Sequence, residues 1–337
     1  MSNSMLPDMP FKEPDPDAAR DDVVAAFRTA DPDGKRAAAI FRATFDQLYD
    51  GQHTGRYRWD QLFKTEKTHF GTLVEINIRR AFDDVIDEPA AGDPLDYKVR
   101  GHDVDCKYSQ RNGGWMLPPE CFGQLLLVAT ADDARGVWSL GVVRASDENR
   151  NKGQNRDAKA SLSMRGRAQI AWLHIEASLP PNILLGLDPI TVEAVLAPKS
   201  GQKRVTELLQ RVTNLRIGRN TIATLAQQDD YMARLRDNGN GARSTLRKLG
   251  YLIPGGDYEV HRKVARQLGA SVPEPGEVVS LRVVPADEAS PWTTELDGRH
   301  WRLAREDEEC REPAPKLPST KKAKPDTVAP PESDLLI

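Results

Sequence analysis

The chain is poor in cysteine. Its 337 residues include three cysteines, Cys106, Cys121 and Cys310, and no two of them have the CxxC spacing. An odd count without that spacing argues against a disulfide framework and against a thiolate zinc site. We expect the three thiols to be reduced, and Cys106 to be a small residue that faces the core.

Long hydrophobic runs are also missing. No stretch of 18 apolar residues occurs, so no membrane-spanning helix and no membrane partner is expected. Residues 1–22 are acidic and rich in proline, and they lack the apolar core of a secretory signal. We therefore expect a cytoplasmic protein.

The whole chain has no large excess of positive or negative charge, but one segment of it has a clear positive excess. The net charge is −3, yet the segment from Lys199 to Arg266 contains fourteen basic and six acidic residues, a net charge of +8. The remainder of the chain therefore carries −11. A basic second half on an acidic chain is typical of a module that binds a polyanion.

The first block of the chain mixes helical and strand patterns. Core spacing predicts two helices and continuous apolar runs predict three strands: helices over 37–51 and 65–82, and strands near 97–109, 123–131 and 137–145. A polar loop at 147–159 precedes another predicted helix that reaches about residue 174. The segment LPPN at 179–182 is a natural linker. This order of elements predicts an α/β domain over residues 21–178.

The second block, residues 183–306, has the order of a winged helix-turn-helix. A helix is predicted over 221–236, a tight turn at NGNG (238–241), a second helix over 242–250 and a strand with a glycine-rich turn over 251–260. Both ends of the chain, residues 1–20 and 307–337, are rich in proline and charge and poor in aromatics. This composition predicts disordered tails.

Charged and apolar residues alternate between Asp103 and Lys107. In a strand, this alternation places Asp103, Asp105 and Lys107 on one face, with Val104 and Cys106 on the other. A solvated sheet face explains such a pattern. The alternative is a site in which carboxylates hold a hard divalent cation beside an ammonium group.

Glu75 lies on an otherwise apolar helical stripe with Ile78 and Phe82. Burying an unpaired carboxylate is costly, so Glu75 needs a partner. Either a basic side chain in a structural ion pair or a metal ion satisfies this requirement.

Together, these acids resemble a known arrangement. Asp96, followed by Asp-x-Lys at Asp105 and Lys107 on a short strand, with Glu75 on a preceding helix, resembles the PD-(D/E)xK nuclease superfamily. Longer strings such as FDQLYDGQHTGRYRWDQLFKTEKTHFGTLVEIN, DVDCK and WMLPPE, then RVTELLQRV and VVPADE, are similar to the NaeI-like type IIE restriction endonucleases. The resemblance extends over roughly residues 20 to 305.

The resemblance implies a restriction-endonuclease-like core, a central mixed sheet flanked by helices, with a C-terminal winged helix-turn-helix-like domain. It implies that Glu75, Asp96, Asp105 and Lys107 are catalytic. Mg²⁺ would be held by Asp96, Asp105 and the backbone carbonyl of Cys106, with Glu75 as a further ligand, while Lys107 would act on the attacking water. Asp103 lies outside the family pattern and is expected to be a spare acid or an ion-pair partner for Arg100.

DNA contacts are expected from two groups of basic residues. In the segment 51–69 these are interleaved with Tyr57 and Trp59, which indicates either phosphate contacts or a solvated loop. On the helix at 242–250, a basic face is expected outward and Leu246 with Leu249 inward. The expected DNA-binding residues are Arg56, Arg58, Lys64, Lys67, Arg243, Arg247 and Lys248.

The sequence thus predicts a homodimeric, Mg²⁺-dependent type II restriction endonuclease that cuts double-stranded DNA at a short palindrome, which the resemblance suggests is GC-rich. The resemblance also implies a second DNA site in each protomer, which acts as an allosteric effector. Two alternatives stay open. One is a non-catalytic winged-helix DNA-binding regulator with a merely solvated acidic strand, and the other is a structure-directed repair nuclease.

Overall fold

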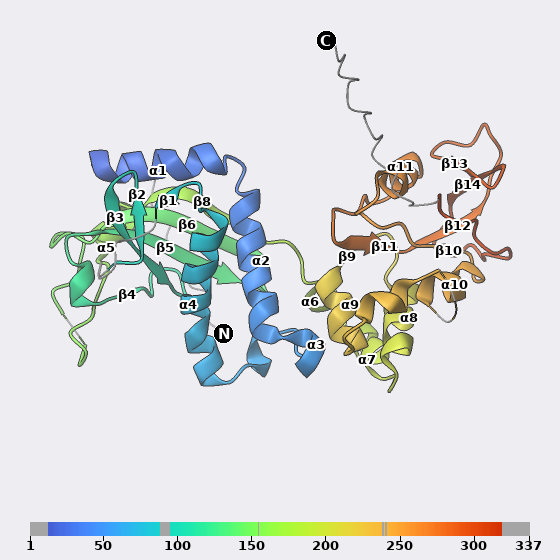
Figure 1. Cartoon of the computed structure of the whole chain (residues 1–337), viewed down its shortest axis with the longest axis horizontal. Coiled ribbons are helices and arrows are strands. Elements are labelled where there is room, and N and C mark those ends of the chain that lie inside the picture. The colour runs from blue at the N-terminus through green and yellow to red at the C-terminus, as the bar shows by residue number, and fades with distance from the viewer. Residues whose placement is uncertain (1–12, 88–94, 154, 238, 240, 319–337) are drawn as a thin grey trace, which may run out of the picture. The chain divides into compact units, whose positions relative to one another are not determined.

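The computed structural model of the chain describes residues 13–87, 95–153, 155–237, 239 and 241–318 (Figure 1). The chain divides into two compact units, Met1–Leu187 and Asp188–Ile337. The units are described separately below. Within the described residues, no helix is long and apolar enough to cross a membrane.

The first unit is built on a six-stranded mixed sheet. The strand order is β1-β2-β3-β5-β6-β8, and β3 pairs with β5 in parallel whereas the other neighbours are antiparallel. The strands are β1 (Ile86–Asp87), β2 (Tyr97–Val99), β3 (His102–Tyr108), β5 (Leu125–Asp132), β6 (Val137–Arg144) and β8 (Ala171–Ser178). A separate short pair consists of β4 (Met116–Leu117) and β7 (Ala160–Ser161).

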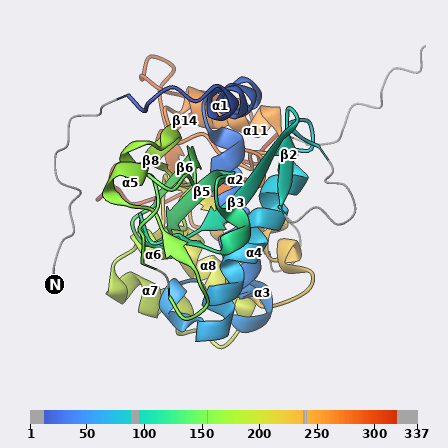
Figure 2. The same cartoon turned by 90° about the vertical axis from the view of Figure 1, so that its left-hand side faces the viewer.

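Helices accompany this sheet (Figure 2). They are α1 (Ala18–Ala30), α2 (Lys35–Tyr49), α3 (Gly51–Thr54), α4 (Lys64–Ala81), α5 (Met164–Ala168) and α6 (Ile183–Gly186), with 3-10 turns at Trp59–Gln61 and Pro119–Cys121. Because side chains alternate along a strand, the sheet feeds two cores. Val104 and Cys106 join the core shared with α1, α2 and α4, whereas Leu126 and Val128 pack with Trp115 on the other face.

Most of the elements predicted for this unit are present. The helices expected over 37–51 and 65–82 are confirmed as α2 and α4, and the strands expected near 123–131 and 137–145 are confirmed as β5 and β6. The segment near 97–109 differs, because a turn at Arg100 and Gly101 divides it into the antiparallel strands β2 and β3. The helix expected between 160 and 174 is wrong, because this segment forms β7, the short α5 and the start of β8. The edge of the sheet decides this, since β8 pairs with β6 along its length.

The N-terminal tail is shorter than predicted. Asp17 accepts a hydrogen bond from the backbone N–H of Arg20 and caps α1, and its carboxylate binds the Arg144 guanidinium at 2.7 Å. The prediction of disorder is therefore wrong for residues 13–20. Residues 1–12 lie outside the described part of the chain.

The second unit combines helices with two small sheets. Its helices are α7 (Pro189–Leu196), α8 (Gly201–Arg211), α9 (Arg219–Ala226), α10 (Ala242–Arg247) and α11 (Glu259–Gln267), with a 3-10 turn at Tyr231–Leu235. Its strands are β9 (Arg216–Gly218), β10 (Tyr251–Leu252), β11 (Glu277–Val279), β12 (Leu281–Pro285), β13 (Thr294–Leu296) and β14 (Arg299–Leu303). One sheet has the order β10-β12-β14-β13, and the other pairs β11 with β9.

Three expectations for this unit differ from the structure. The helix predicted over 221–236 ends at Ala226, because Gln227 adopts a left-handed conformation with φ 50°. The strand predicted over 251–260 is limited to β10, and α11 begins at Glu259. Residues 307–318, assigned to a disordered tail, pack on the unit, where Ala314 is buried and its N–H donates to the Arg247 carbonyl at 2.8 Å. Residues 319–337 lie outside the described chain.

Candidate active site

A tight hairpin brings Asp96 beside Asp105. Arg100 and Gly101 connect β2 to β3 and both have positive φ, 47° and 80°. This is the backbone of the two-residue turns that suit twisted antiparallel strands. The register pairs Tyr97 with Val104, so the preceding Asp96 lies opposite Asp105. The nine-residue separation of the two acids therefore follows from the short turn.

The Asp96 carboxylate is held at the strand. It accepts a hydrogen bond from the backbone N–H of Cys106 at 2.8 Å and shares another with the Asp105 carboxyl group. Burial, the hydrogen bond with Asp105 and the negative charge of that residue raise the pKa of Asp96 to about 7. The two acids thus repel each other when both are ionised.

Helix α4 supplies the third acid. The Tyr97 hydroxyl donates to the backbone carbonyl of Glu75 at 2.7 Å and joins α4 to β2. The half-buried Glu75 carboxyl group hydrogen-bonds to Asp96, and burial raises its pKa, although the Lys107 ammonium opposes this change. The structure therefore brings together Glu75, Asp96 and Asp105, three residues predicted to be catalytic.

Lys107 completes the cluster. Its ammonium group contacts the Asp105 carboxylate and donates to the Cys106 carbonyl at 3.2 Å. Burial would lower the pKa of Lys107, but the Asp105 carboxylate raises it above its usual value. Lys107 is therefore a cation placed against a buried acid.

Cys121, which the sequence analysis left without a role, also contacts this cluster. The turn Pro119–Cys121 places its thiol against Asp105, where it donates to Oδ2 at 2.7 Å. The side chain is fully buried, and burial raises the pKa of the thiol. No local pattern connects positions 105 and 121, so sequence alone had no signal for this contact.

Asp103 is not part of the cluster. It is exposed, and its carboxylate pairs with the Lys98 ammonium on the neighbouring strand at 3.2 Å. Arg100 pairs instead with Asp22 at 2.8 Å, so the expected ion pair between Asp103 and Arg100 is wrong. The β2–β3 register explains this, because it sets Lys98 opposite Asp103.

The donor atoms of the cluster are oxygens of the kind that Mg²⁺ prefers. Within the described residues, however, no three His, Cys, Asp or Glu side chains are arranged so that they could hold a metal ion. In this structure the Asp105 carboxylate contacts the Lys107 ammonium and the Cys121 thiol.

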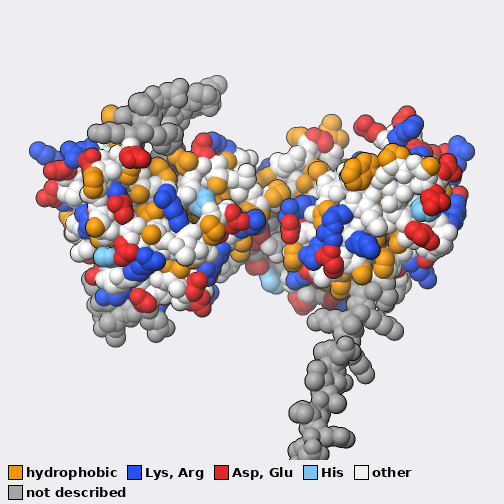
Figure 3. All heavy atoms as spheres, turned by 90° about the horizontal axis from the view of Figure 1, so that it is seen from above, with side chains coloured by type: hydrophobic (Ala, Val, Ile, Leu, Met, Phe, Trp, Pro, Cys, Tyr) orange, Lys and Arg blue, Asp and Glu red, His pale blue; other side chains and the backbone are white. Residues whose placement is uncertain are grey.

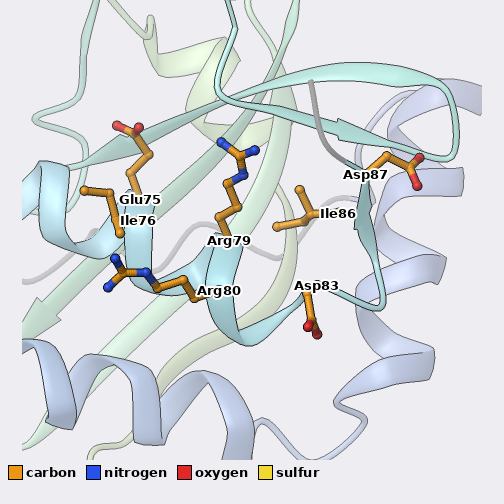
Figure 4. Close-up of a pocket in the computed structure, with 7 residues that line it drawn as sticks. All are labelled: Glu75, Ile76, Arg79, Arg80, Asp83, Ile86 and Asp87. Carbon is orange, nitrogen blue, oxygen red and sulfur yellow. The ribbon is translucent and has the colours of Figure 1, made fainter. Parts of the chain in front are cut away.

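A hollow of about 760 Å³ opens beside Glu75 (Figure 4). It is lined by Glu75, Ile76, Arg79, Arg80, Asp83, Ile86 and Asp87. Sequence reasoning missed Arg79, although its position four residues after Glu75 on a helix was a usable signal.

Comparisons with known proteins show the family of this chain. The family model described as "Restriction endonuclease NaeI" matches residues 21–312. The chain is also 46% identical over 302 residues to "Type II restriction enzyme NaeI" from Lentzea aerocolonigenes, covering 87% of this chain and 92% of that relative. The chain belongs to the NaeI family. It is therefore a restriction endonuclease, an enzyme that cleaves DNA internally.

In this NaeI-family chain, the basic residues near the active site differ in whether other groups of the protein already bind them. Arg56 donates to the Glu66 carboxylate at 2.8 Å and to the Tyr49 carbonyl at 3.2 Å, so it stabilises the start of α4. Arg58 pairs with Asp60 at 3.0 Å.

Lys64 and Lys67, on the first turn of α4, form no ion pair with any residue that the structure describes. These two lysines are thus the freer of the four predicted DNA contacts in this segment.

The basic residues of α10 also differ from the expectation. Arg243 is partly buried, its Nε donates to the Ile253 carbonyl at 3.0 Å, and burial lowers the pKa of its guanidinium. Arg247 approaches Asp237 at 3.9 Å, whereas Lys248 is exposed. Leu246 is buried as predicted, but Leu249 is 49% exposed, so the prediction that it faces inward is wrong.

The surface of the NaeI-family chain carries charges of both signs. On the face shown in Figure 3, basic and acidic side chains are interspersed on each unit. On this face, the unit that contains the basic segment is therefore not uniformly basic.

Proposed function

We propose that this enzyme is a Mg²⁺-dependent type II endonuclease that cuts both strands of a short palindromic site, which is GC-rich. The observation that carries the proposal is the convergence of Glu75, Asp96 and Asp105 with Lys107. Negative charges that raise the pKa of a buried acid such as Asp96 are costly to keep together unless they serve a site. Family membership supports the same reaction.

The residues fit the ion in chemistry. Asp96, Asp105 and the Cys106 carbonyl would hold it, with Glu75 as a further ligand, because hard oxygen donors suit Mg²⁺. When bound, Mg²⁺ lowers the pKa of a water molecule and neutralises charge on a phosphate. The raised pKa of Asp96, about 7, supports this assignment, since a nearby cation would relieve the repulsion between the acids.

The side chains of this protein have distinct parts in the reaction. Lys107 lies beside Asp105 and directs an ammonium group toward the cluster, so it orients the attacking water or a phosphate oxygen. Glu75 and Asp96 share a hydrogen bond, which holds the acid from α4 against the acid that precedes β2. Cleavage by this arrangement needs no serine, histidine or cysteine nucleophile.

A plasmid digest tests the proposal. The purified chain is incubated with plasmid DNA in Mg²⁺, with EDTA as the control, and the ends of the fragments are sequenced. We expect discrete fragments whose ends share one palindrome. Cleavage at unrelated sequences would support a structure-directed nuclease instead, and cleavage in EDTA would count against Mg²⁺.

Lys107→Ala separates chemistry from binding. We expect the cleavage rate to fall far more than the affinity for Mg²⁺ measured by calorimetry with DNA present. Cleavage at the wild-type rate would remove Lys107 from the site.

We also propose that the second unit, residues 183–306 in the sequence-based boundaries, is a winged-helix-like module that binds a second DNA duplex as an effector. The succession α8, β9, α9, α10 and β10 supports it, since a winged helix begins in this order, although α11 lies between β10 and the later strands β11 and β12. β11 pairs with β9, and β12 pairs with β10. Exposed Lys248 at the end of α10 is the most accessible predicted phosphate contact of that helix.

A homodimer fits the proposal, because two-fold symmetry matches a palindrome.

Effector coupling is tested on a plasmid with one poor site. Added duplex that carries the recognition sequence should stimulate cutting by the wild type, because occupancy of one site favours the active state of the other. The double variant Arg247→Ala, Lys248→Ala should lose this stimulation, whereas Arg135→Ala in the first unit should keep it. Simple competition by the duplex would exclude an effector site. We propose that the enzyme acts in the prokaryotic cytoplasm.

A further inference from the structure

The hollow beside Glu75 contains an uncompensated cation. Arg79 lies four residues, about one helical turn, after Glu75 on α4, about 6 Å along the axis. In Figure 4 the Glu75 carboxylate and the Arg79 guanidinium extend from α4 toward the same end of the hollow. Arg79 is exposed, and it forms no ion pair or hydrogen bond with any residue that the structure describes.

The acids of the hollow do not neutralise Arg79 directly. Asp83 lies at the opposite end of the hollow, 4.0 Å from the Arg36 guanidinium. Asp87 extends away to a third side. Glu75 is engaged with Asp96 in the acid cluster, and Arg79 acts on it only through space, by lowering its pKa. The guanidinium is therefore open to an anion from outside the chain.

We infer that Arg79 binds a backbone phosphate of the cleaved strand, next to the scissile phosphate. This inference rests on the proposed function, because it assumes that the strand passes the cluster of Glu75, Asp96 and Asp105. A strand held there carries further phosphates beyond the reacting one. A free guanidinium one helical turn away presents the planar fork that suits a phosphate group.

Arg80 provides a matched control. It is adjacent in sequence, also exposed, lines the same hollow and forms no ion pair among the described residues. In Figure 4 its guanidinium extends to the side of Ile76, whereas the Arg79 guanidinium extends in the same direction as the Glu75 carboxylate. A general electrostatic attraction would treat the two arginines alike, whereas a specific phosphate contact distinguishes them.

The first measurement is the binding of a duplex that the wild-type enzyme cuts, without divalent cation, over a range of salt concentrations. Arg79→Gln should weaken binding about tenfold. It should also reduce the salt slope by about 1, as expected for one lost phosphate contact. Arg80→Gln should change both values less. Equal effects of the two substitutions would overturn the inference.

The second measurement locates the phosphate. A series of duplexes carries one neutral methylphosphonate at successive positions near the cut. The wild type should bind less tightly when the methylphosphonate replaces one particular phosphate next to the scissile phosphate. Arg79→Gln should bind that modified duplex as tightly as it binds the unmodified duplex. Arg79→Lys should show a smaller loss there than Arg79→Gln, because the charge is kept. If the loss of affinity from the substitution and the loss from the methylphosphonate add at every position, the inference is overturned.

Failure of the inference is distinguishable from failure of the proposed function. A wild-type chain that neither binds nor cuts any duplex would overturn both. A wild type that cuts normally, with Arg79→Gln binding as tightly, would overturn the role of Arg79 alone. Thermal unfolding of each variant verifies that these exposed substitutions leave the fold intact.

Discussion

The acid cluster of the first unit and the basic segment of the second unit differ in how their charged side chains are paired. In the cluster, Glu75, Asp96 and Asp105 lie against one another with Lys107 as their close cation. In the basic segment, many arginines are paired with acids: Arg211 with Glu207, Arg216 with Glu277, Arg219 with Asp257, Arg236 with Asp230, and Arg262 and Arg266 with Glu259. Ion pairs between side chains stabilise the fold, whereas several buried side chains of the same charge, close together, indicate a functional site.

The comparison also changes the meaning of the net charge. The excess of +8 suggests a surface for a polyanion, yet some of its arginines are neutralised by acids outside the segment, such as Glu277. Among the described residues, the lysines of this segment form no ion pair, so we propose that they are the more accessible contacts for DNA. Lys248 is the member of that set nearest to the predicted recognition helix.

The largest expected effect tests the acid cluster of the first unit. Asp105→Asn removes a buried negative charge without changing shape, so the cleavage rate should fall by about 10³-fold or more. DNA binding by gel shift should be largely retained. Asp103→Asn is the matched control on the same strand, because Asp103 is exposed and pairs only with Lys98 among the acid–base contacts described here. Comparable loss in both variants would remove the assigned site.

The second prediction tests compensated charge within the first unit. Asp133 is buried, binds the buried Arg42 guanidinium and accepts from the Tyr49 hydroxyl at 2.9 Å. Asp133→Ala leaves Arg42 buried with fewer partners, so the free energy of unfolding should fall by about 3–5 kcal/mol. Arg135→Ala breaks an exposed pair with Glu176 and should cost less than about 1 kcal/mol in urea unfolding. Similar costs would refute the distinction.

The third prediction concerns pH. His261 is buried beside Arg243, and burial and then that charge lower its pKa to about 4. The unfolded chain binds a proton near pH 6.5, so it binds more protons than the folded chain between pH 6.5 and 4. Stability is therefore full above pH 6.5 and is lost as the pH falls through this window, by about 3 kcal/mol in all.

Hydrogen exchange of the α11 amides at pH 5 and pH 7, corrected for intrinsic exchange rates, measures this effect in the full chain. His261→Gln should abolish most of the pH dependence. His69→Gln, at an exposed position on α4, should leave it unchanged. Equal protection at both pH values in the wild type would contradict the prediction.

The smallest expected effect separates free from engaged cations in α10. Lys248→Ala should weaken duplex binding by the second unit and reduce the salt slope of the full chain by about 1, measured by fluorescence anisotropy. Arg243→Ala should instead lower stability, because its Nε hydrogen bond to the Ile253 carbonyl is lost. A salt slope that responds to Arg243 and not to Lys248 would reverse this assignment.

The sequence by itself determined the local parts of the site. The alternation from Asp103 to Lys107 placed Asp105 and Lys107 on one strand face, and the helical period placed Glu75 with Ile78. These two features are decided by backbone geometry over a few residues, so they are readable from the order of residue types. The two-residue turn at Arg100 and Gly101, which sets Asp96 opposite Asp105, was not predicted, because the segment near 97–109 was expected to be strand.

The tertiary structure alone decided which charges stay free. Arg100 pairs with Asp22, Asp133 pairs with Arg42, and Cys121 reaches Asp105, each across a long stretch of chain. The same is true of the segment at 160–174, where pairing with β6 produces strand β8 in place of a helix. Partners distant in sequence are selected by packing and by the cost of burying charge, and local patterns carry no record of that selection.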